Sequence, residues 1–291
     1  MSSSPSPVRS AAETPPRLIV TDMDGTLLDA SGMKVSDRNM AALRRAQDAG
    51  VPVVIATGRP IWWLTPVLEA GFTGVAVCMN GAIVYDVGAD DIIAASPLTP
   101  EVMQTFIGRL TELDPTVSLA VERLGTTLQA CIAEESYDHP WAFGYFQRSP
   151  RETLLAEPVA KLLVRGRTDS RTLAAVAQEA ADTMGWTTTE DSAEVDGSPV
   201  HITWSTDDGL IEVAAAGVNK GAALDRLAAR WDIDPAHAIA FGDMPNDLEM
   251  FAWAGRAVAM GNAHNDVVAV ADEIAADHHD DGVARVLERW F

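Results

Sequence analysis

The chain has 291 residues, of which 47% are hydrophobic and 22% are charged, which is enough apolar material for one large or two ordinary globular domains. The formal net charge of −21 argues against nucleic acid and anionic membranes as partners, because both require a basic face. Two cysteines cannot form a disulfide framework, and no apolar run reaches the ~18 residues of a membrane span. We expect a cytoplasmic protein that is a monomer or a small homo-oligomer.

The first half of the sequence alternates between strand and helix patterns. Residues 1–16 are rich in Ser and Pro and lack an apolar signal segment, so a disordered tail is expected there. The following elements are then predicted in chain order: strand 17–21, helix 36–49, strand 51–56, helix 61–70, strand 75–79, a tight turn at Asn80-Gly81 and strand 82–85. This alternation predicts an α/β fold, a Rossmann-like parallel sheet with helices on both faces.

The middle of the chain, residues 87–215, has a different pattern. Its predicted elements are helices over 100–113 and 170–184 and strands near 118–121, 127–133 and 160–164, followed by two strands within 200–213 that join at the turn 207–209. The strand–helix alternation then returns with helix 220–231 and strands 238–241 and 257–260. We therefore expect residues 17–86 and 216–291 to form the core domain, and residues 87–215 to form an inserted α+β cap domain.

Polar side chains follow three of the predicted parallel strands. Asp22 and Asp24 follow the first strand, Thr57 follows the second, and Asp243 and Asp247 follow the strand near residue 240. Ligands of open parallel sheets bind at the carboxyl ends of the strands. One such loop could simply be a turn, but four carboxylates at one edge would repel each other unless a cation lay among them. Hard oxygen ligands in a partly open site favour Mg²⁺.

Four short motifs in this order resemble those of the haloacid dehalogenase superfamily. Residues 22–27 (DMDGTL) resemble its first signature, residues 57–59 (TGR) the second, Lys220 the third and residues 242–247 (GDMPND) the fourth. Segments 80–82, 161–164, 218–221 and 261–263 are similar to the Cof-type branch, whose large type IIB α/β cap lies between the second and third motifs. The insert of this chain lies at the same place.

The resemblance implies a role for each matching residue. Asp22 would be the nucleophile that forms an aspartyl-phosphate, and Asp24 the general acid and base. Mg²⁺ would be bound by Asp22, Asp243 and the backbone carbonyl of Asp24, with Asp247 as a ligand or as the holder of a metal-bound water. The expected phosphate contacts are Thr57, Lys220, Asn246 and the amides of Met23 and Gly58. Arg59 is as consistent with a structural role as with a catalytic one.

The function that we expect is Mg²⁺-dependent hydrolysis of small phosphorylated metabolites that resemble sugar phosphates. A phosphotransferase or phosphomutase would use the same aspartyl-phosphate and differ only in the acceptor. A non-catalytic receiver-like module would also place acidic residues, a Thr and a Lys at strand ends, but it needs neither Asp24 nor a long insert. Because the insert connects beside the active-site edge, it could close over a small ester and leave no room for a folded protein.

Overall fold

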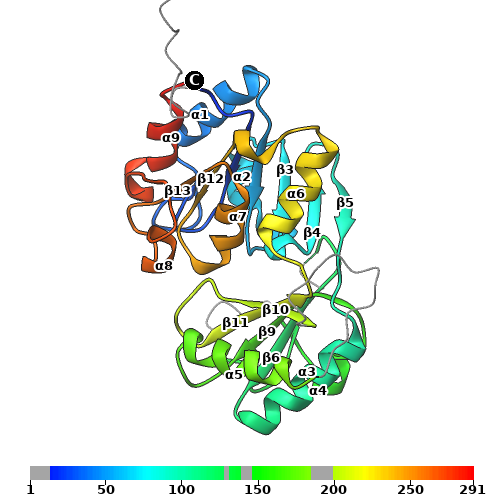
Figure 1. Cartoon of the computed structure of the whole chain (residues 1–291). Helices are drawn as coiled ribbons and strands as arrows, with labels where there is room; N and C mark the ends of the chain where they lie inside the picture. The colour runs from blue at the N-terminus through cyan, green and yellow to red at the C-terminus, as the bar shows by residue number, and fades with distance from the viewer. Residues whose placement is uncertain (1–13, 128–130, 139–145, 185–198) are drawn as a thin grey trace, which may run out of the picture.

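The computed structural model describes residues 14–127, 131–138, 146–184 and 199–291. The expected tail, residues 1–16, lies almost entirely outside these described residues, as does part of the strand predicted over 127–133. Two sheets organise the described chain, and in Figure 1 the larger one lies above the smaller. No described helix is long and apolar enough to cross a membrane.

The larger sheet has eight strands in the order β14-β13-β12-β1-β2-β3-β4-β5. Its strands are β1 (Leu18–Thr21), β2 (Val53–Ala56), β3 (Val75–Cys78), β4 (Ile83–Asp86), β5 (Asp91–Ala95), β12 (Ala238–Gly242), β13 (Arg256–Ala259) and β14 (Glu273–Ile274). The six strands from β14 to β3 are parallel, while β4 and β5 are added antiparallel at one edge. Strand order reverses between β1 and β12, and such a reversal is where α/β sheets bind ligands.

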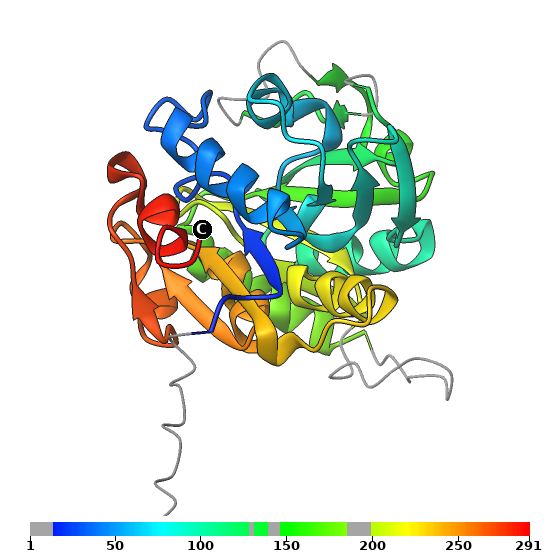
Figure 2. The same cartoon turned by 90° about the horizontal axis from the view of Figure 1, so that it is seen from above.

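Helices cover both faces of the larger sheet, as the sequence predicts. One face packs against α1 (Asp37–Asp48) and α9 (Gly282–Leu287), and the other against α6 (Lys220–Arg230) and α7 (Leu248–Trp253). Figure 2, viewed from above, shows the blue and red helices on one side of the sheet and the yellow and orange ones on the other. Both faces of β1 are therefore buried, which explains its continuous apolar sequence.

The helix predicted over residues 61–70 is interrupted. The structure has a 3₁₀ turn, η2 (Ile61–Trp63), and then a short helix, α2 (Thr65–Glu69). Pro66 is the physical reason, because proline has no N–H and cannot donate the helical hydrogen bond to the carbonyl of Trp62, whereas it is well tolerated in the first turn of a new helix. The sequence prediction of one continuous helix was wrong at this point.

The strand β5 departs from the predicted organisation. It falls inside the range 87–215 that we expected to belong to the insert, yet it pairs with β4 in the larger sheet. Residues 92–95 form a short apolar run, but no strand was predicted there, and their side chains are exposed or half-buried in the structure. The chain thus leaves the larger sheet after Ala95 rather than after Asp86.

The smaller sheet has the strand order β10-β11-β9-β6-β7-β8 and is antiparallel except between β7 and β8. Its strands are β6 (Ser118–Arg123), β7 (Cys131–Ala133), β8 (Gln147–Arg148), β9 (Val159–Arg165), β10 (Val200–Thr203) and β11 (Leu210–Ala215). The helices α3 (Pro100–Leu113) and α5 (Ser170–Asp182) pack on one face. A shorter helix, α4 (Arg151–Leu154), lies beside β6. The helices α3 and α5 and the strands β6, β9, β10 and β11 lie where the sequence predicted helices and strands, whereas β8 and α4 were not predicted.

Candidate active site

Three buried aspartates meet where β1 and β12 end. Asp22 follows β1, and its N–H donates to the carbonyl of Phe241 at 2.9 Å, which aligns the two strand ends. Asp243 follows β12, and Asp247 lies one turn further along the chain. Carboxylate oxygens of all three residues lie within 4.8 Å of one another. The structure therefore brings together the side chains that the sequence predicts at this edge of the sheet.

Lys220 is the cation at the centre of this group. It is fully buried, and its Nζ lies 2.7 Å from Asp22 Oδ1 and 2.7 Å from Asp247 Oδ1. Lys220 opens α6, whose N-cap Asn219 accepts a hydrogen bond from the N–H of Ala222. Gly81 lets the turn after β3 approach this helix start, because a Cβ there would lie 2.3 Å from the Asn219 carbonyl oxygen.

Asp243 and Asp247 are held by different partners. Both oxygens of Asp247 are used by the protein: Oδ1 faces Lys220, and Oδ2 accepts from the N–H groups of Asp243 at 2.9 Å and Met244 at 3.1 Å. Asp243 Oδ1 accepts from the Thr26 hydroxyl at 2.7 Å. Gly25 leaves the space for this carboxylate, because a Cβ at Gly25 would lie 2.2 Å from Asp243 Oδ2.

The site carries more negative than positive charge. Burial raises the pKa of Asp22 well above its usual range, with Asp247, Asp243 and Asp24 adding to the rise and Lys220 opposing it. Burial and the nearby Asp247 raise the pKa of Asp243 to about 7. Three close carboxylates beside one ammonium group are the oxygen-rich, electron-rich donor set that a hard divalent cation requires. The residues present therefore fit Mg²⁺.

This charge excess predicts an unusual stability profile for the metal-free protein. In the folded protein the pKa of Asp243 is raised from 3.8 to about 7, so ionisation of this residue lowers the free energy of unfolding. This loss is absent below pH 3.8, grows as the pH rises to 7 and reaches its full size above pH 7. Asp243→Asn removes that charge and keeps an oxygen that can accept from Thr26. We expect a Tm several degrees above wild type at pH 8 in EDTA, and a smaller gain at pH 5.

Thermal melting of both proteins across this pH range measures the effect. Asp91→Asn, an exposed aspartate on β5, is the matched control and should leave the Tm unchanged. Equal gains at pH 5 and pH 8 would contradict the electrostatic explanation.

Asp24 lies at the cavity wall and is held by Arg59. The Arg59 guanidinium donates to both Asp24 oxygens, at 2.7 Å from Nε and 2.5 Å from Nη2, and also to the carbonyls of Gly32 and Trp63. The Asp24 side chain remains 54% exposed. The sequence left the role of Arg59 open, and the structure shows that its guanidinium fixes the orientation of the Asp24 carboxylate.

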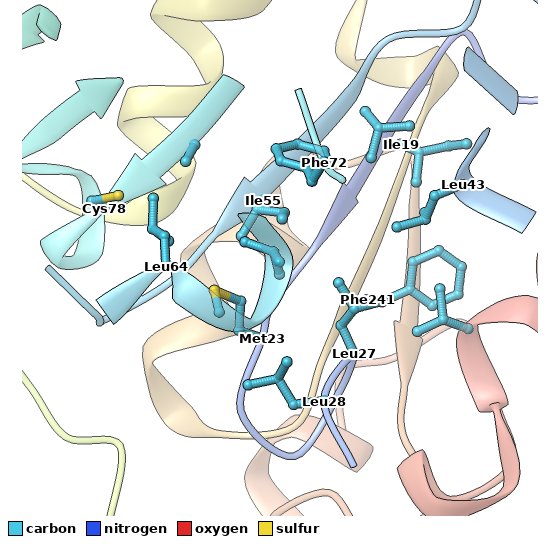
Figure 3. Packing of buried hydrophobic residues seen from close by; sticks show 14 of the residues in the cluster. Ile19, Met23, Leu27, Leu28, Leu43, Ile55, Leu64, Phe72, Cys78 and Phe241 are labelled. Carbon is cyan, nitrogen blue, oxygen red and sulfur yellow. The ribbon is translucent and has the colours of Figure 1, made fainter. Parts of the chain in front are cut away.

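The predicted phosphate contacts divide into two groups. Gly58 and Asn246 line the cavity in front of Asp22, whereas Met23, Thr57 and Lys220 are not among the described residues that line it. The Met23 side chain packs in the apolar core beside Ile55 and Leu64 (Figure 3). The Thr57 hydroxyl accepts from the N–H of Arg59 at 3.1 Å. Phosphate binding by all five residues, Met23, Thr57, Gly58, Lys220 and Asn246, stays a prediction.

A cavity of about 670 Å³ opens in front of Asp22 and is bounded by both sheets. The sequence predictions missed three polar residues in and behind its wall, namely Asn80, Glu122 and Glu212. Asn80 Nδ2 donates to Glu212 Oε2 at 2.6 Å, and Asn80 Oδ1 accepts from Asn246 at 3.1 Å. For Glu122 and Glu212 the sequence signal was a charge inside an otherwise apolar strand, which is rare unless the charge is paired.

A family model described as haloacid dehalogenase-like hydrolase matches residues 19–287. The chain belongs to this family, as its four motifs indicated, and is a hydrolase.

Curated relatives match over nearly their whole length. A 5-amino-6-(5-phospho-D-ribitylamino)uracil phosphatase of Bacillus subtilis is 28% identical, covering 96% of this chain and 99% of the relative. An HMP-PP phosphatase of Cronobacter sakazakii is 29% identical, covering 94% and 96%. A pyridoxal phosphate phosphatase of Escherichia coli is 28% identical, covering 93% and 97%.

Solved structures share the fold. A haloacid dehalogenase-like hydrolase from Bacteroides thetaiotaomicron, 27% identical, superposes with a TM-score of 0.71 over 94% of this chain and 99% of that one. A sugar phosphatase of haloacid dehalogenase subclass IIB, 20% identical, gives a TM-score of 0.74 over 94% and 98%. The α/β core with an inserted cap is therefore the fold of this family.

Proposed function

We propose that the protein is a Mg²⁺-dependent phosphatase that hydrolyses small phosphorylated metabolites through an aspartyl-phosphate on Asp22. The observation that carries this proposal is the position of Asp22: it ends a buried strand, contacts Lys220 at 2.7 Å and lines a cavity shared with Asp24. The names of the relatives support it, since each is a phosphatase of a small phosphorylated compound.

The metal would be held by the Asp22 and Asp243 side chains and by the backbone carbonyl of Asp24. Asp247, whose two oxygens already accept hydrogen bonds from the protein, would act through a metal-bound water or share one oxygen with the metal. When bound, Mg²⁺ supplies the positive charge that lets an anionic nucleophile approach an anionic phosphate.

The protein groups would act in two chemical steps. In the first, an Asp22 oxygen attacks phosphorus, the ester P–O bond breaks, and Asp24 gives its proton to the leaving oxygen. In the second, the Asp24 carboxylate takes a proton from a water that attacks the aspartyl-phosphate, which releases phosphate and restores Asp22. Lys220, Asn246 and Thr57, with the amides of Met23 and Gly58, would hold the phosphoryl oxygens throughout.

The cavity argues for a small substrate. A volume of about 670 Å³ is typical of sites for small molecules and is too small for a folded protein. We propose that the core consists of residues 17–86 and 216–291 together with β5, and that the rest of the range 87–215 is a cap that supplies the far wall. A sugar phosphate or similar polyol ester would fill such a site.

Phosphate release from a panel of phosphorylated metabolites, with p-nitrophenyl phosphate as a simple ester, tests the proposal. Activity is expected to disappear in EDTA and to return with excess Mg²⁺, because the buried aspartates cannot approach a phosphate dianion without the cation. Undiminished hydrolysis in a chelated, metal-free sample would contradict the metal requirement. Transfer of the phosphoryl group to an added alcohol without free phosphate would instead identify a phosphotransferase.

A further inference from the structure

Three buried charged side chains from the smaller sheet form a cluster, Glu122, Lys161 and Glu212, that lines the cavity opposite the phosphate site. Their exposed fractions are only 1%, 4% and 4%. We call these three residues the charged cluster. None of them has a part in the two chemical steps above, and burial of charge is costly, so their presence in the cavity wall requires an explanation.

The pleat of the sheet places the charged cluster on the face toward the cavity. Side chains alternate between the two faces of a strand. In β9, Leu162 and Val164 pack under the helices α3 and α5, so Lys161 and Leu163 lie on the opposite face. Glu122 is the direct partner of Lys161 in the β6–β9 register. The cluster therefore belongs to the surface that a leaving group would meet.

The hydrogen bonds of the charged cluster show that it offers acceptors, rather than donors, to a molecule in the cavity. Lys161 has three N–H groups, and its Nζ lies 2.7 Å from the Gly58 carbonyl oxygen, 3.0 Å from Glu212 Oε2 and 3.0 Å from Glu122 Oε2. Two of these oxygens accept hydrogen bonds from the lysine and the third forms an ion pair with it, so its positive charge is already shared among protein groups. Glu212 is further satisfied by Asn80 at 2.6 Å and Ser205 at 2.5 Å.

Glu122 is the least satisfied member of the cluster. Apart from its ion pair with Lys161, its buried Oε2 accepts no hydrogen bond of good geometry from the described residues. A carboxylate has about four acceptor positions, so Glu122 retains capacity for a donor from a bound molecule. With two carboxylates and one ammonium group, the cluster has a formal net charge of −1. Because it is buried, it would strongly repel a negatively charged group on a bound molecule.

We propose that Glu122 is a specificity-determining residue that selects leaving groups presenting a hydroxyl or amino hydrogen and rejects those bearing a carboxylate or a second phosphate. Lys161 and Glu212 position it. The remaining wall is largely apolar, with Met33, Pro60, Trp63, Leu163 and Met244, and suits the carbon skeleton of such a group. This inference rests on the proposed phosphatase function.

Three esters test it, assayed by phosphate release with Mg²⁺ at pH 7: glucose 6-phosphate and glucosamine 6-phosphate, which carry no carboxylate, and the open-chain 6-phosphogluconate, which carries one. For the wild type, kcat/KM of the two esters without a carboxylate is expected to exceed that of 6-phosphogluconate by about tenfold or more, since like charges in a desolvated site repel strongly. Glu122→Gln keeps the shape and removes the charge, and should reduce this ratio by about fivefold or more, chiefly by improving the carboxylate substrate.

The matched control is Glu112→Gln, the same change at an exposed position on α3, and it should leave the ratio unchanged. Hydrolysis of p-nitrophenyl phosphate by each variant checks that the catalytic residues still work. If Glu122→Gln lowers kcat/KM for all three esters by one common factor, the cluster is only structural and the inference is overturned.

Two further results separate this inference from the proposed function. If wild type hydrolyses p-nitrophenyl phosphate but does not distinguish the three sugar esters, or turns over none of them, the inference fails and the phosphatase function stands. If no phosphomonoester is hydrolysed at all, both fail. The inference is supported if the ratio of kcat/KM between the esters without a carboxylate and 6-phosphogluconate is about tenfold in wild type and in the control but smaller in Glu122→Gln. A lower melting temperature of Glu122→Gln would not change this conclusion.

Discussion

Asp22→Asn is expected to lower kcat for phosphate release by on the order of 10⁵-fold, because an amide of the same shape is not a useful nucleophile. The fold should survive, since the Asn oxygen can still accept a hydrogen bond from Lys220, which lies 2.7 Å from Asp22 Oδ1. Substitution also removes one of three mutually repelling buried carboxylates. The measurement is phosphate release with saturating Mg²⁺, together with a thermal melt of the same sample.

Asp48→Asn is the matched control for this variant. Asp48 is exposed at the end of α1, far along the chain from the strand ends that hold the site, and its substitution should change neither kcat nor Tm. If a folded Asp22→Asn protein kept wild-type rates, Asp22 would not be the nucleophile and the aspartyl-phosphate mechanism would be wrong.

Lys220→Met is expected to destabilise the metal-free protein by about 3–5 kcal/mol at pH 8 and to abolish activity. The loss leaves Asp22 and Asp247 buried with no cation in contact among the described residues, since each is paired with Lys220 at 2.7 Å. At pH 5 the loss should be smaller, because a carboxyl whose pKa is raised can take up a proton instead of remaining a buried charge. Denaturant unfolding in EDTA at both pH values measures it.

Lys34→Met, which removes an exposed lysine, is the control and should cost little at either pH. A Lys220→Met protein as stable as wild type at pH 8 would show that the two carboxylates do not need their shared cation. Mg²⁺ should recover part of the lost stability, since a divalent ion among the same oxygens replaces some of the missing positive charge.

The parts of the fold and site that could be predicted are those encoded within short segments. A buried parallel strand is a continuous apolar run, so β1, β2 and β12 are visible in the sequence, and the aspartates that follow β1 and β12 are placed by the strands themselves. The meeting of Asp22, Asp243 and Asp247 follows once these strands are parallel neighbours. The chain's membership of the hydrolase family agrees with that interpretation.

The remaining features depend on pairings that no local pattern contains. Glu122 and Lys161 face each other only because β6 and β9, between which β7, β8 and α4 lie along the chain, are neighbours in the smaller sheet. The bond from Arg59 to Asp24 joins two motifs whose side-chain directions cannot be inferred from spacing. The pairing of the edge strand β5 with β4 is another contact that no local pattern specified, so the insert was predicted to begin at residue 87, before β5.

The contact from Lys161 to the Gly58 carbonyl has a thermodynamic consequence for turnover. It joins the smaller sheet to the loop that would hold the phosphate. A second contact, the Asn80–Glu212 hydrogen bond, joins the smaller sheet to the turn after β3. Any separation of the sheets must break both contacts and expose their charges. By reciprocity, a ligand that stabilises this junction is itself bound more tightly by the same free energy. If the dephosphorylated product is held in this way, its release would limit kcat. A variant that weakens the two contacts would then have a higher kcat and a weaker affinity for the ligand.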